Sequence, residues 1–160
     1  MQAANAMGEL RSMPALVYAA VRHIGPYDTV GASFERVIGW ARQHGLMQPG
    51  TKVIGLAWDK PFMVPAEQLR YDAAITIDRK IQVPQDIHIA ALPAMTWFMG
   101  VHRGSYALMA DSFMRLGSEM GLHADVVHVP ICSLEIYLNG PGTPEADLVT
   151  EIGFPIVRLN

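Results

Sequence analysis

The feature of this sequence that most restricts its possible folds is an internal repeat with a spacing of 79 residues. The turn His23-Ile24-Gly25-Pro26-Tyr27 returns as His102-Arg103-Gly104-Ser105-Tyr106. Other landmarks keep the offset to within one residue: Phe34 with Phe113, Pro65 with Pro144, Leu69 with Leu148, and Asp59-Lys60-Pro61 with Asn139-Gly140-Pro141. Because composition alone does not hold one offset over so many landmarks, the chain consists of two copies of one structural unit.

Each copy predicts the order strand–helix–strand–strand. In the first copy we expect strands at 15–23, 53–58 and 71–78, and a helix at 28–44 whose apolar residues recur at helical spacing. Gly45 stands where a left-handed residue ends a helix. Three strands and one helix are too few to bury their own apolar face. We therefore expect an α+β fold in which two such repeats pack with pseudo-twofold symmetry and both helices lie on one side.

The expected domain covers residues 14–160 as a single unit, with repeats at about 14–78 and 94–158 joined by 79–93. Residues 1–13 lack the basic start and apolar block of a signal peptide. We expect them to form a flexible tail, as chain termini often do.

Composition excludes several classes of protein. Hydrophobic residues make up 51% of the 160 residues and charged ones 17%, which is typical of a folded chain. The net charge of −3, without a basic run, argues against nucleic acid as the main partner. The single Cys132 rules out an intrachain disulfide and fits a reducing compartment. No apolar run reaches the length of a membrane span, so we expect a cytoplasmic protein without membrane contact.

The segment 132–139 alternates as a strand does. Leu134 and Ile136 share one face, and Glu135 and Tyr137 share the other. If the second face meets water, Glu135 is an ordinary solvated carboxylate. If it meets a cavity, Glu135 is a buried anion that needs a positive partner.

The repeat places small residues at the positions equivalent to this carboxylate and phenol. With an offset of 80, Glu135 corresponds to Gly55 and Tyr137 to Ala57. Small side chains there leave room for a ligand between the halves. Gly55 is equally explained by a bulge or a close backbone approach, and both interpretations stay open.

Several motifs together resemble a known family. They are the paired His-x-Gly-x-Tyr turns, Leu69-Arg70-Tyr71-Asp72-Ala73, Leu134-Glu135-Ile136-Tyr137-Leu138-Asn139, and the closing run from Thr143 to Ile152 followed by Pro155-Ile156. Over residues 14–158 the chain resembles the GyrI-like small-molecule-binding family, also called the bacterial effector-binding domain. This is the ligand module of AraC-type and MerR-type multidrug regulators such as Rob and BmrR.

The resemblance implies a curved antiparallel sheet and an aromatic pocket with a central glutamate, which falls on Glu135, for bulky lipophilic cations. Ala57 and Gly100 stand where relatives often have larger side chains, which implies a wider or differently shaped pocket. No DNA-binding helices precede or follow the module in this sequence, so we expect a stand-alone form without direct DNA binding. Any role in transcription would then need a partner.

A site for such cations needs apolar area, aromatic faces and one anion. The candidate ligand-binding residues are Glu135, Tyr137, Trp97, Phe98, Trp58 and Tyr71. Strand alternation predicts that Trp97 and Phe98 point to opposite faces, so at most one of them lines the site. Trp58 is out of phase with Ala57, which predicts a place on the helix side. For every ring except Tyr137, core packing is an equal alternative.

Three functions remain open. The first is binding of amphipathic cations for sequestration or drug resistance. We favour this binding function over an enzymatic one. The second, also implied by the resemblance, is hydrolysis of electrophilic cyclopropanoid compounds with Glu135 and Tyr137 as catalytic residues. The third is interaction with DNA gyrase. We expect no cofactor and no metal, because no histidine pair has helical metal-ligand spacing.

Overall fold

The computed structural model describes residues 7–160, so the expectation of a tail over residues 1–6 lies outside the described residues. The chain divides into two compact units, each treated by itself below. The first unit comprises residues 15–93, and the second comprises residues 94–160 with the N-terminal segment up to Pro14. The prediction of a single domain over 14–160 stays a prediction.

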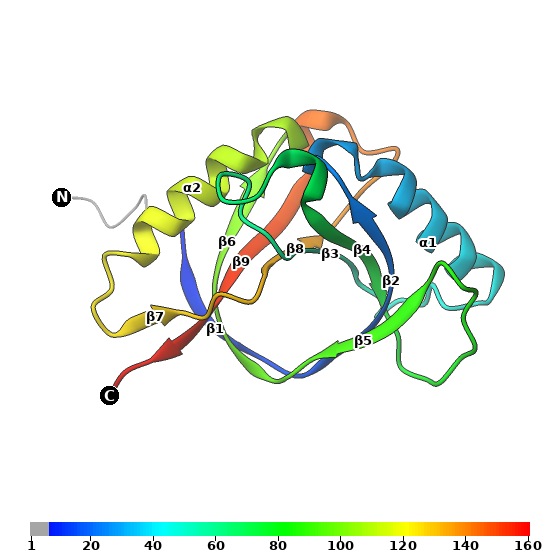
Figure 1. The fold of residues 1–160 in the computed structure, drawn as a ribbon, viewed down its shortest axis with the longest axis horizontal. Helices are drawn as coiled ribbons and strands as arrows, with labels where there is room; N and C mark the ends of the chain where they lie inside the picture. Colours follow the sequence, from blue (N-terminus) through cyan, green and yellow to red (C-terminus); the bar gives the residue numbers. More distant parts are fainter. Residues whose placement is uncertain (1–6) are drawn as a thin grey trace. The chain divides into compact units, whose positions relative to one another are not determined.

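The first unit is an antiparallel sheet with one long helix (Figure 1). Its elements are β2 (Leu16–Ile24), α1 (Gly31–Gln43), β3 (Val53–Ala57), β4 (Arg70–Thr76) and β5 (His88–Leu92), with 3₁₀ turns at Tyr27–Thr29 and Ala66–Gln68. The strands pair in the order β3-β4-β2-β5. Gly45 has φ 65°, which confirms the left-handed residue after the helix.

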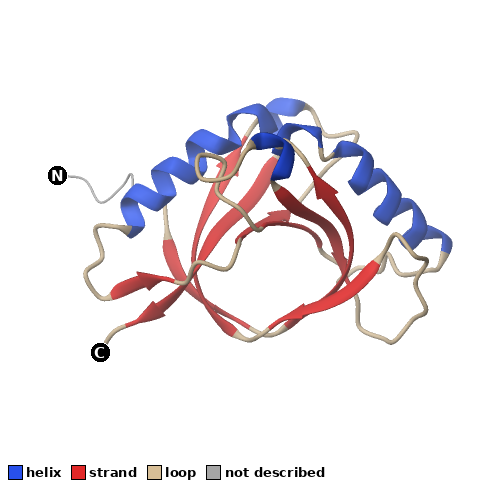
Figure 2. Cartoon of the chain, in the orientation of Figure 1, coloured by secondary structure: helices blue, strands red, loops and turns tan. Residues whose placement is uncertain are grey.

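The second unit repeats this plan (Figure 2). Its elements are β1 (Glu9–Met13), β6 (Met95–Arg103), α2 (Met109–Met120), β7 (Val126–His128), β8 (Ser133–Tyr137) and β9 (Val149–Arg158), with 3₁₀ turns at Tyr106–Leu108 and Glu145–Asp147. The strands pair in the order β1-β6-β9-β8, and β7 adds to the end of β9. The predicted α+β duplication is confirmed.

The repeat extends to individual hydrogen bonds. Gly25 N donates to Leu69 O, and Gly104 N donates to Leu148 O, each at 2.8 Å. Both glycines have positive φ, 141° and 99°, a conformation that residues with a Cβ rarely adopt. The turn that begins each copy is therefore tied in the same way to the start of its last strand.

The N-terminal segment and the joining segment each contain a strand. Residues Glu9–Met13 form β1, which pairs with β6. Residues His88–Leu92 form β5, which pairs with β2. The tail expected over residues 1–13 is therefore wrong for 9–13, because pairing satisfies that backbone. The strand that precedes each repeat completes the sheet of the other one.

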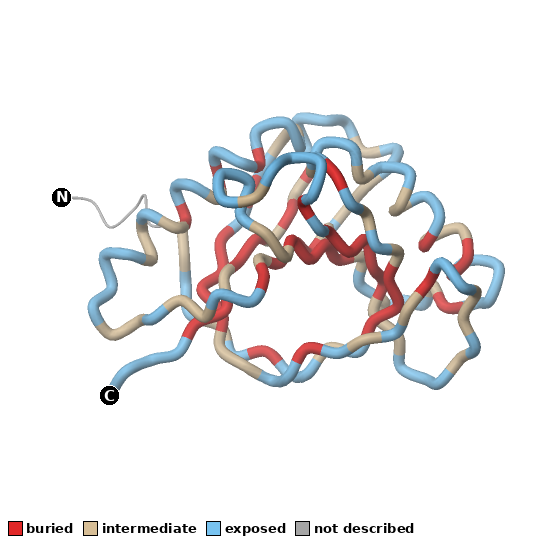
Figure 3. The backbone as a smooth tube through the Cα atoms, viewed as in Figure 1, coloured by how far each residue is buried: buried red, intermediate tan, exposed pale blue. Residues whose placement is uncertain are grey.

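Each unit buries the helix against one face of its own sheet. In the first unit Val37 and Trp40 of α1 pack over Ala73 and Ile75 of β4. In the second unit Leu116 of α2 packs with Phe98, Ile152 and Ile156. In Figure 3 the buried residues concentrate in the strands, and many residues along the two helices are exposed. The apolar helix stripes read from the sequence are the buried faces.

Candidate functional site

Glu135 and Tyr137 lie on the sheet face that α2 covers. Glu135 is paired with Ile152 and Tyr137 with Thr150 across β8 and β9. Directly paired residues share a face, and Ile152 packs in the core beneath α2. The carboxylate therefore lies within the layer between sheet and helix, rather than on a face that the helix leaves bare.

The carboxylate of Glu135 is buried and held by its neighbour on the strand. Only 9% of the residue is exposed. The hydroxyl of Tyr137 donates to Oε1 of Glu135 at 2.6 Å. This length is at the short end of the range for O–H···O hydrogen bonds in proteins.

A second tyrosine packs against the ring of Tyr137. Tyr106, in the 3₁₀ turn before α2, meets the ring of Tyr137 edge-on, with centroids 5.4 Å apart and planes at 89°. Burial, and then the negative charge of Glu135, raise the pKa of the Tyr106 phenol above its ordinary value of 10.0. Tyr106 is 45% exposed, so its ring also meets solvent.

The sequence analysis did not select Tyr106 as a site residue. The signal was present, because Tyr106 closes the second His-x-Gly-x-Tyr turn. Its counterpart Tyr27 instead donates to the carbonyls of Asp59 and Arg70 and packs on Tyr71. By analogy with Tyr27, repeat symmetry predicts only a structural role for Tyr106. The contact of Tyr106 with Tyr137 has no counterpart in the first copy, where Ala57 replaces Tyr137.

Phe98 and Trp97 point to opposite faces of β6, as predicted. Phe98 is on the α2 side, in the core with Leu116 and Ile152. Trp97 is paired with Pro155 and lies on the other face, and both rings are 1% exposed. The roles of Trp97 and Phe98 as ligand-binding residues stay predictions.

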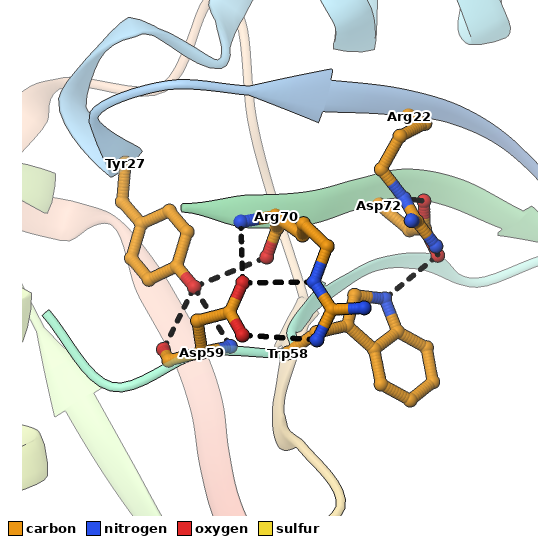
Figure 4. A network of polar contacts seen from close by, with 6 residues as sticks. All are labelled: Arg22, Tyr27, Trp58, Asp59, Arg70 and Asp72. Atoms are coloured by element: carbon orange, nitrogen blue, oxygen red, sulfur yellow. Dashed lines mark hydrogen bonds and ion pairs between the residues drawn. The ribbon is translucent and has the colours of Figure 1, made fainter. Parts of the chain in front are cut away.

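Trp58 and Tyr71 belong to the first unit. Trp58 donates from Nε1 to Oδ2 of Asp72 at 2.8 Å, beside the ion pair of Asp72 with Arg22 (Figure 4). Asp72 alternates with Tyr71 and Ala73, which face α1, so Trp58 lies toward the face away from the helix. The expected helix-side position of Trp58 is therefore wrong, because Ala57 itself packs in the core with α1, and alternation sends Trp58 to the other face. Tyr71 is buried among Tyr27 and Phe34 as a core ring.

Gly100 does not open space over the sheet. A Cβ at this position would lie 2.9 Å from Cδ1 of Leu116 and 3.0 Å from Cγ of Met7. The glycine thus allows α2 and the N-terminal segment to approach β6 closely. The expectation of a wider pocket at Gly100 is wrong on this face, because neighbouring side chains fill the room.

Polar side chains form a row across the second unit next to this pair. His102 on β6 is paired with Thr150 on β9, which is paired with Tyr137 on β8. His102 uses both ring nitrogens, 2.6 Å from Oγ of Ser112 and 2.7 Å from the carbonyl of Ser105. Among the described residues, Oγ1 of Thr150 is buried and has no hydrogen-bond partner.

Other site types find no support in residues 7–160. Of two surface hollows, one is lined by Trp40 and His44, and one of about 540 Å³ is lined by His102, Ser112 and Arg115 at the end of this row. Over the same range, no three His, Cys, Asp or Glu side chains are grouped to hold a metal ion. No helix within it combines the length and the apolar character that a bilayer crossing requires.

Comparison with known proteins gives the family and one curated relative. The family model of the GyrI-like small molecule binding domain matches residues 6–157. A protein named DNA gyrase inhibitor from Pectobacterium carotovorum is 31% identical over 110 residues, which cover 64% of this chain and 70% of that protein.

Solved structures share the fold. The EcmrR–DNA complex superposes with a TM-score of 0.75 at 18% identity, covering 95% of this chain but 57% of that one. The EcmrR C-terminal domain alone gives 0.74 and is covered over 98% of its length. SAV2435 bound to tetraphenylphosphonium gives 0.69 at 14% identity, covering 95% and 94% of the two chains. With the family model matching nearly its whole length, this chain belongs to the GyrI-like small-molecule-binding family.

Proposed function

We propose that this protein binds bulky lipophilic cations, with the carboxylate of Glu135 as the anion and the rings of Tyr137 and Tyr106 beside it. The observation that carries the proposal is the buried Glu135, held by a 2.6 Å hydrogen bond from Tyr137. A carboxylate withdrawn from water is most stable beside a positive charge, and a neutral guest brings it no such charge. The site therefore selects by charge.

The two tyrosine rings supply the other half of the recognition. The face of an aromatic ring attracts a cation by roughly 0.5–2 kcal/mol, more when water is excluded. Tyr137 and Tyr106 meet edge-to-face, and Tyr106 alone of the two is largely exposed. A ligand beside Glu135 would therefore bring its charge against aromatic surface.

The chain's relatives favour the same ligand class. SAV2435 has been solved with tetraphenylphosphonium bound, a cation with four aromatic rings and a buried charge. This supports the use of tetraphenylphosphonium as the probe for this chain. The identity of 14% leaves the contacts to be argued from the residues above.

A fluorescence titration tests the proposal with a matched pair of probes. Tetraphenylphosphonium and neutral triphenylphosphine oxide present similar aromatic surface and differ in charge. We expect the cation to bind at least tenfold more tightly, and Glu135→Gln to remove that preference. Equal binding of both compounds, or an unchanged cation affinity in Glu135→Gln, would contradict the proposal.

The same hydrogen bond also favours hydrolysis as a second candidate function. A carboxylate next to a phenolic hydroxyl is a pair that can orient water and transfer a proton. Prolonged incubation with an electrophilic cyclopropane tests it. Product formed by the wild type and lost in Glu135→Gln supports hydrolysis, and recovery of intact compound excludes it for that substrate class. Gyrase binding, suggested by the curated relative's name, is tested separately by gyrase retention on the immobilised chain.

A further inference from the structure

The hydroxyl of Thr150 lies beside the proposed cation site without a partner of its own. Thr150 is fully buried, and Oγ1 makes no hydrogen bond to any described residue. A buried hydroxyl left unpaired is costly, and such groups normally have a protein, water or ligand partner. Because Thr150 lies between His102 and Tyr137, a ligand of the proposed site could be the partner of its hydroxyl.

The neighbours on either side direct their polar atoms elsewhere. The carbonyl of Ser105 only accepts, so Nε2–H of His102 donates to it, and Nδ1 of the same ring is hydrogen-bonded with Oγ of Ser112. Tyr137 sends its hydroxyl hydrogen to Glu135. On each side of Thr150, the neighbouring polar side chain is therefore hydrogen-bonded to another residue.

The first unit has a different arrangement at the equivalent register. There Tyr71 on β4 is paired with Ala57 on β3, and its ring packs on Tyr27 and Phe34. In the second unit the corresponding pair is Thr150 and Tyr137. The large ring has been exchanged for a small hydroxyl-bearing side chain, and the aromatic ring stands on the strand that carries Glu135. The second unit thus has the polar Thr150 at the position where the first unit has the core ring of Tyr71.

Thr150 is also within reach of a ligand held by Glu135. It is paired with Tyr137, two residues along β8, so the side chains of Thr150 and Glu135 are diagonal neighbours on one face. Two hydrogen bonds of about 2.9 Å from one tetrahedral nitrogen reach acceptors about 4.7 Å apart. An ammonium group that bonds both would stand between these two side chains.

We propose that Thr150 is a ligand-binding residue, and that the ligand of this site is a lipophilic protonated amine with at least two N–H groups rather than a fully substituted cation. One N–H bonds the carboxylate of Glu135, and another bonds Oγ1 of Thr150. The inference rests on the proposed function, because it places the amine at the Glu135 site. It adds that the site distinguishes cations by hydrogen-bond donors as well as by charge.

The test uses two cations that differ only at nitrogen. Dibenzylammonium carries two N–H groups, and dibenzyldimethylammonium carries none. Isothermal titration calorimetry on the full chain at pH 7 gives both dissociation constants. We expect Thr150→Val to weaken dibenzylammonium binding roughly tenfold, the loss typical of one hydrogen bond to a charged group, with the quaternary cation unchanged within about twofold. Thr150→Ser, which keeps the hydroxyl, retains most of the selectivity.

The outcomes separate this inference from the function on which it rests. Equal losses for both cations in Thr150→Val, or no loss for either, would overturn the role of Thr150 while cation binding stands. Glu135→Gln is expected to weaken both cations. If it weakens neither, or if neither cation binds the wild type, the proposed function fails and the amine inference fails with it.

Discussion

The hydroxyl of Tyr137 donates a 2.6 Å hydrogen bond to Oε1 of Glu135, from two residues along the same face of β8. One strand thus supplies both the anion and the ring that the proposed site requires. The short link keeps the carboxylate in one orientation before any ligand arrives, and preorganisation of this kind reduces the cost of binding.

Removing the Tyr137 hydroxyl should weaken cation binding while keeping the aromatic surface. We expect Tyr137→Phe to raise the dissociation constant for tetraphenylphosphonium roughly threefold to tenfold, since the carboxylate loses the donor that orients it. Tyr106→Phe is the matched control, because the contact of Tyr106 with Tyr137 is between rings. Similar constants for the two variants would contradict the orienting role.

The charge of Glu135 should be detectable at Tyr106. Burial and then that charge raise the pKa of the Tyr106 phenol, so Glu135→Gln is expected to lower it toward 10.0 without restoring it fully. Ultraviolet absorbance of phenolate, with Tyr106→Phe to identify the transition, measures the change. An unchanged Tyr106 titration would show that the two groups do not interact.

Thr150→Val should stabilise the ligand-free protein. The variant keeps the shape of the side chain and removes a buried hydroxyl without a partner among the described residues, which is expected to add about 1 kcal/mol. Thr76→Val is the control, because the Thr76 hydroxyl accepts from the backbone of Lys52 at 2.8 Å and its loss should destabilise. Urea unfolding measures both, and a destabilised Thr150→Val would contradict the unpaired state.

The ion pair of Asp72 should contribute much more to stability than the exposed pair of Asp86. Asp72 is fully buried and accepts from Arg22 and Trp58, whereas Asp86 pairs with Arg36 at the surface. Asp72→Ala leaves those donors without their acceptor and is expected to cost about 3 kcal/mol. Asp86→Ala should change the urea midpoint little. Equal midpoints would contradict this ranking.

Acid should weaken the first unit partly through Asp59. Hydrogen bonds from the Arg70 guanidinium hold the pKa of Asp59 below its ordinary value of 3.8. A depressed folded pKa gives stability that is present above pH 3.8 and lost as the pH falls through the folded value. The midpoint temperature of thermal unfolding should therefore fall less steeply between about pH 5 and 2 in Asp59→Asn than in the wild type. The exposed Asp28→Asn serves as the control, and identical slopes in all three proteins would contradict the assignment.

The repeat and the paired face of Glu135 were predictable from sequence because both depend on local order. The 79-residue offset reproduces the turn bonds of Gly25 and Gly104, and strand alternation puts Glu135 beside Tyr137. The strand β1 was not predicted, because strand pairing between distant segments leaves little trace in the paired residues themselves. The positions of Tyr106, Trp58 and Thr150 depend on contacts across strands, which alternation within one strand does not specify.

A structure of the protein with tetraphenylphosphonium bound tests the central claim most directly. The account predicts the phosphonium beside the carboxylate of Glu135, with phenyl groups against the rings of Tyr137 and Tyr106. A cation bound elsewhere, with Glu135 still buried and bonded only within the protein, would contradict it.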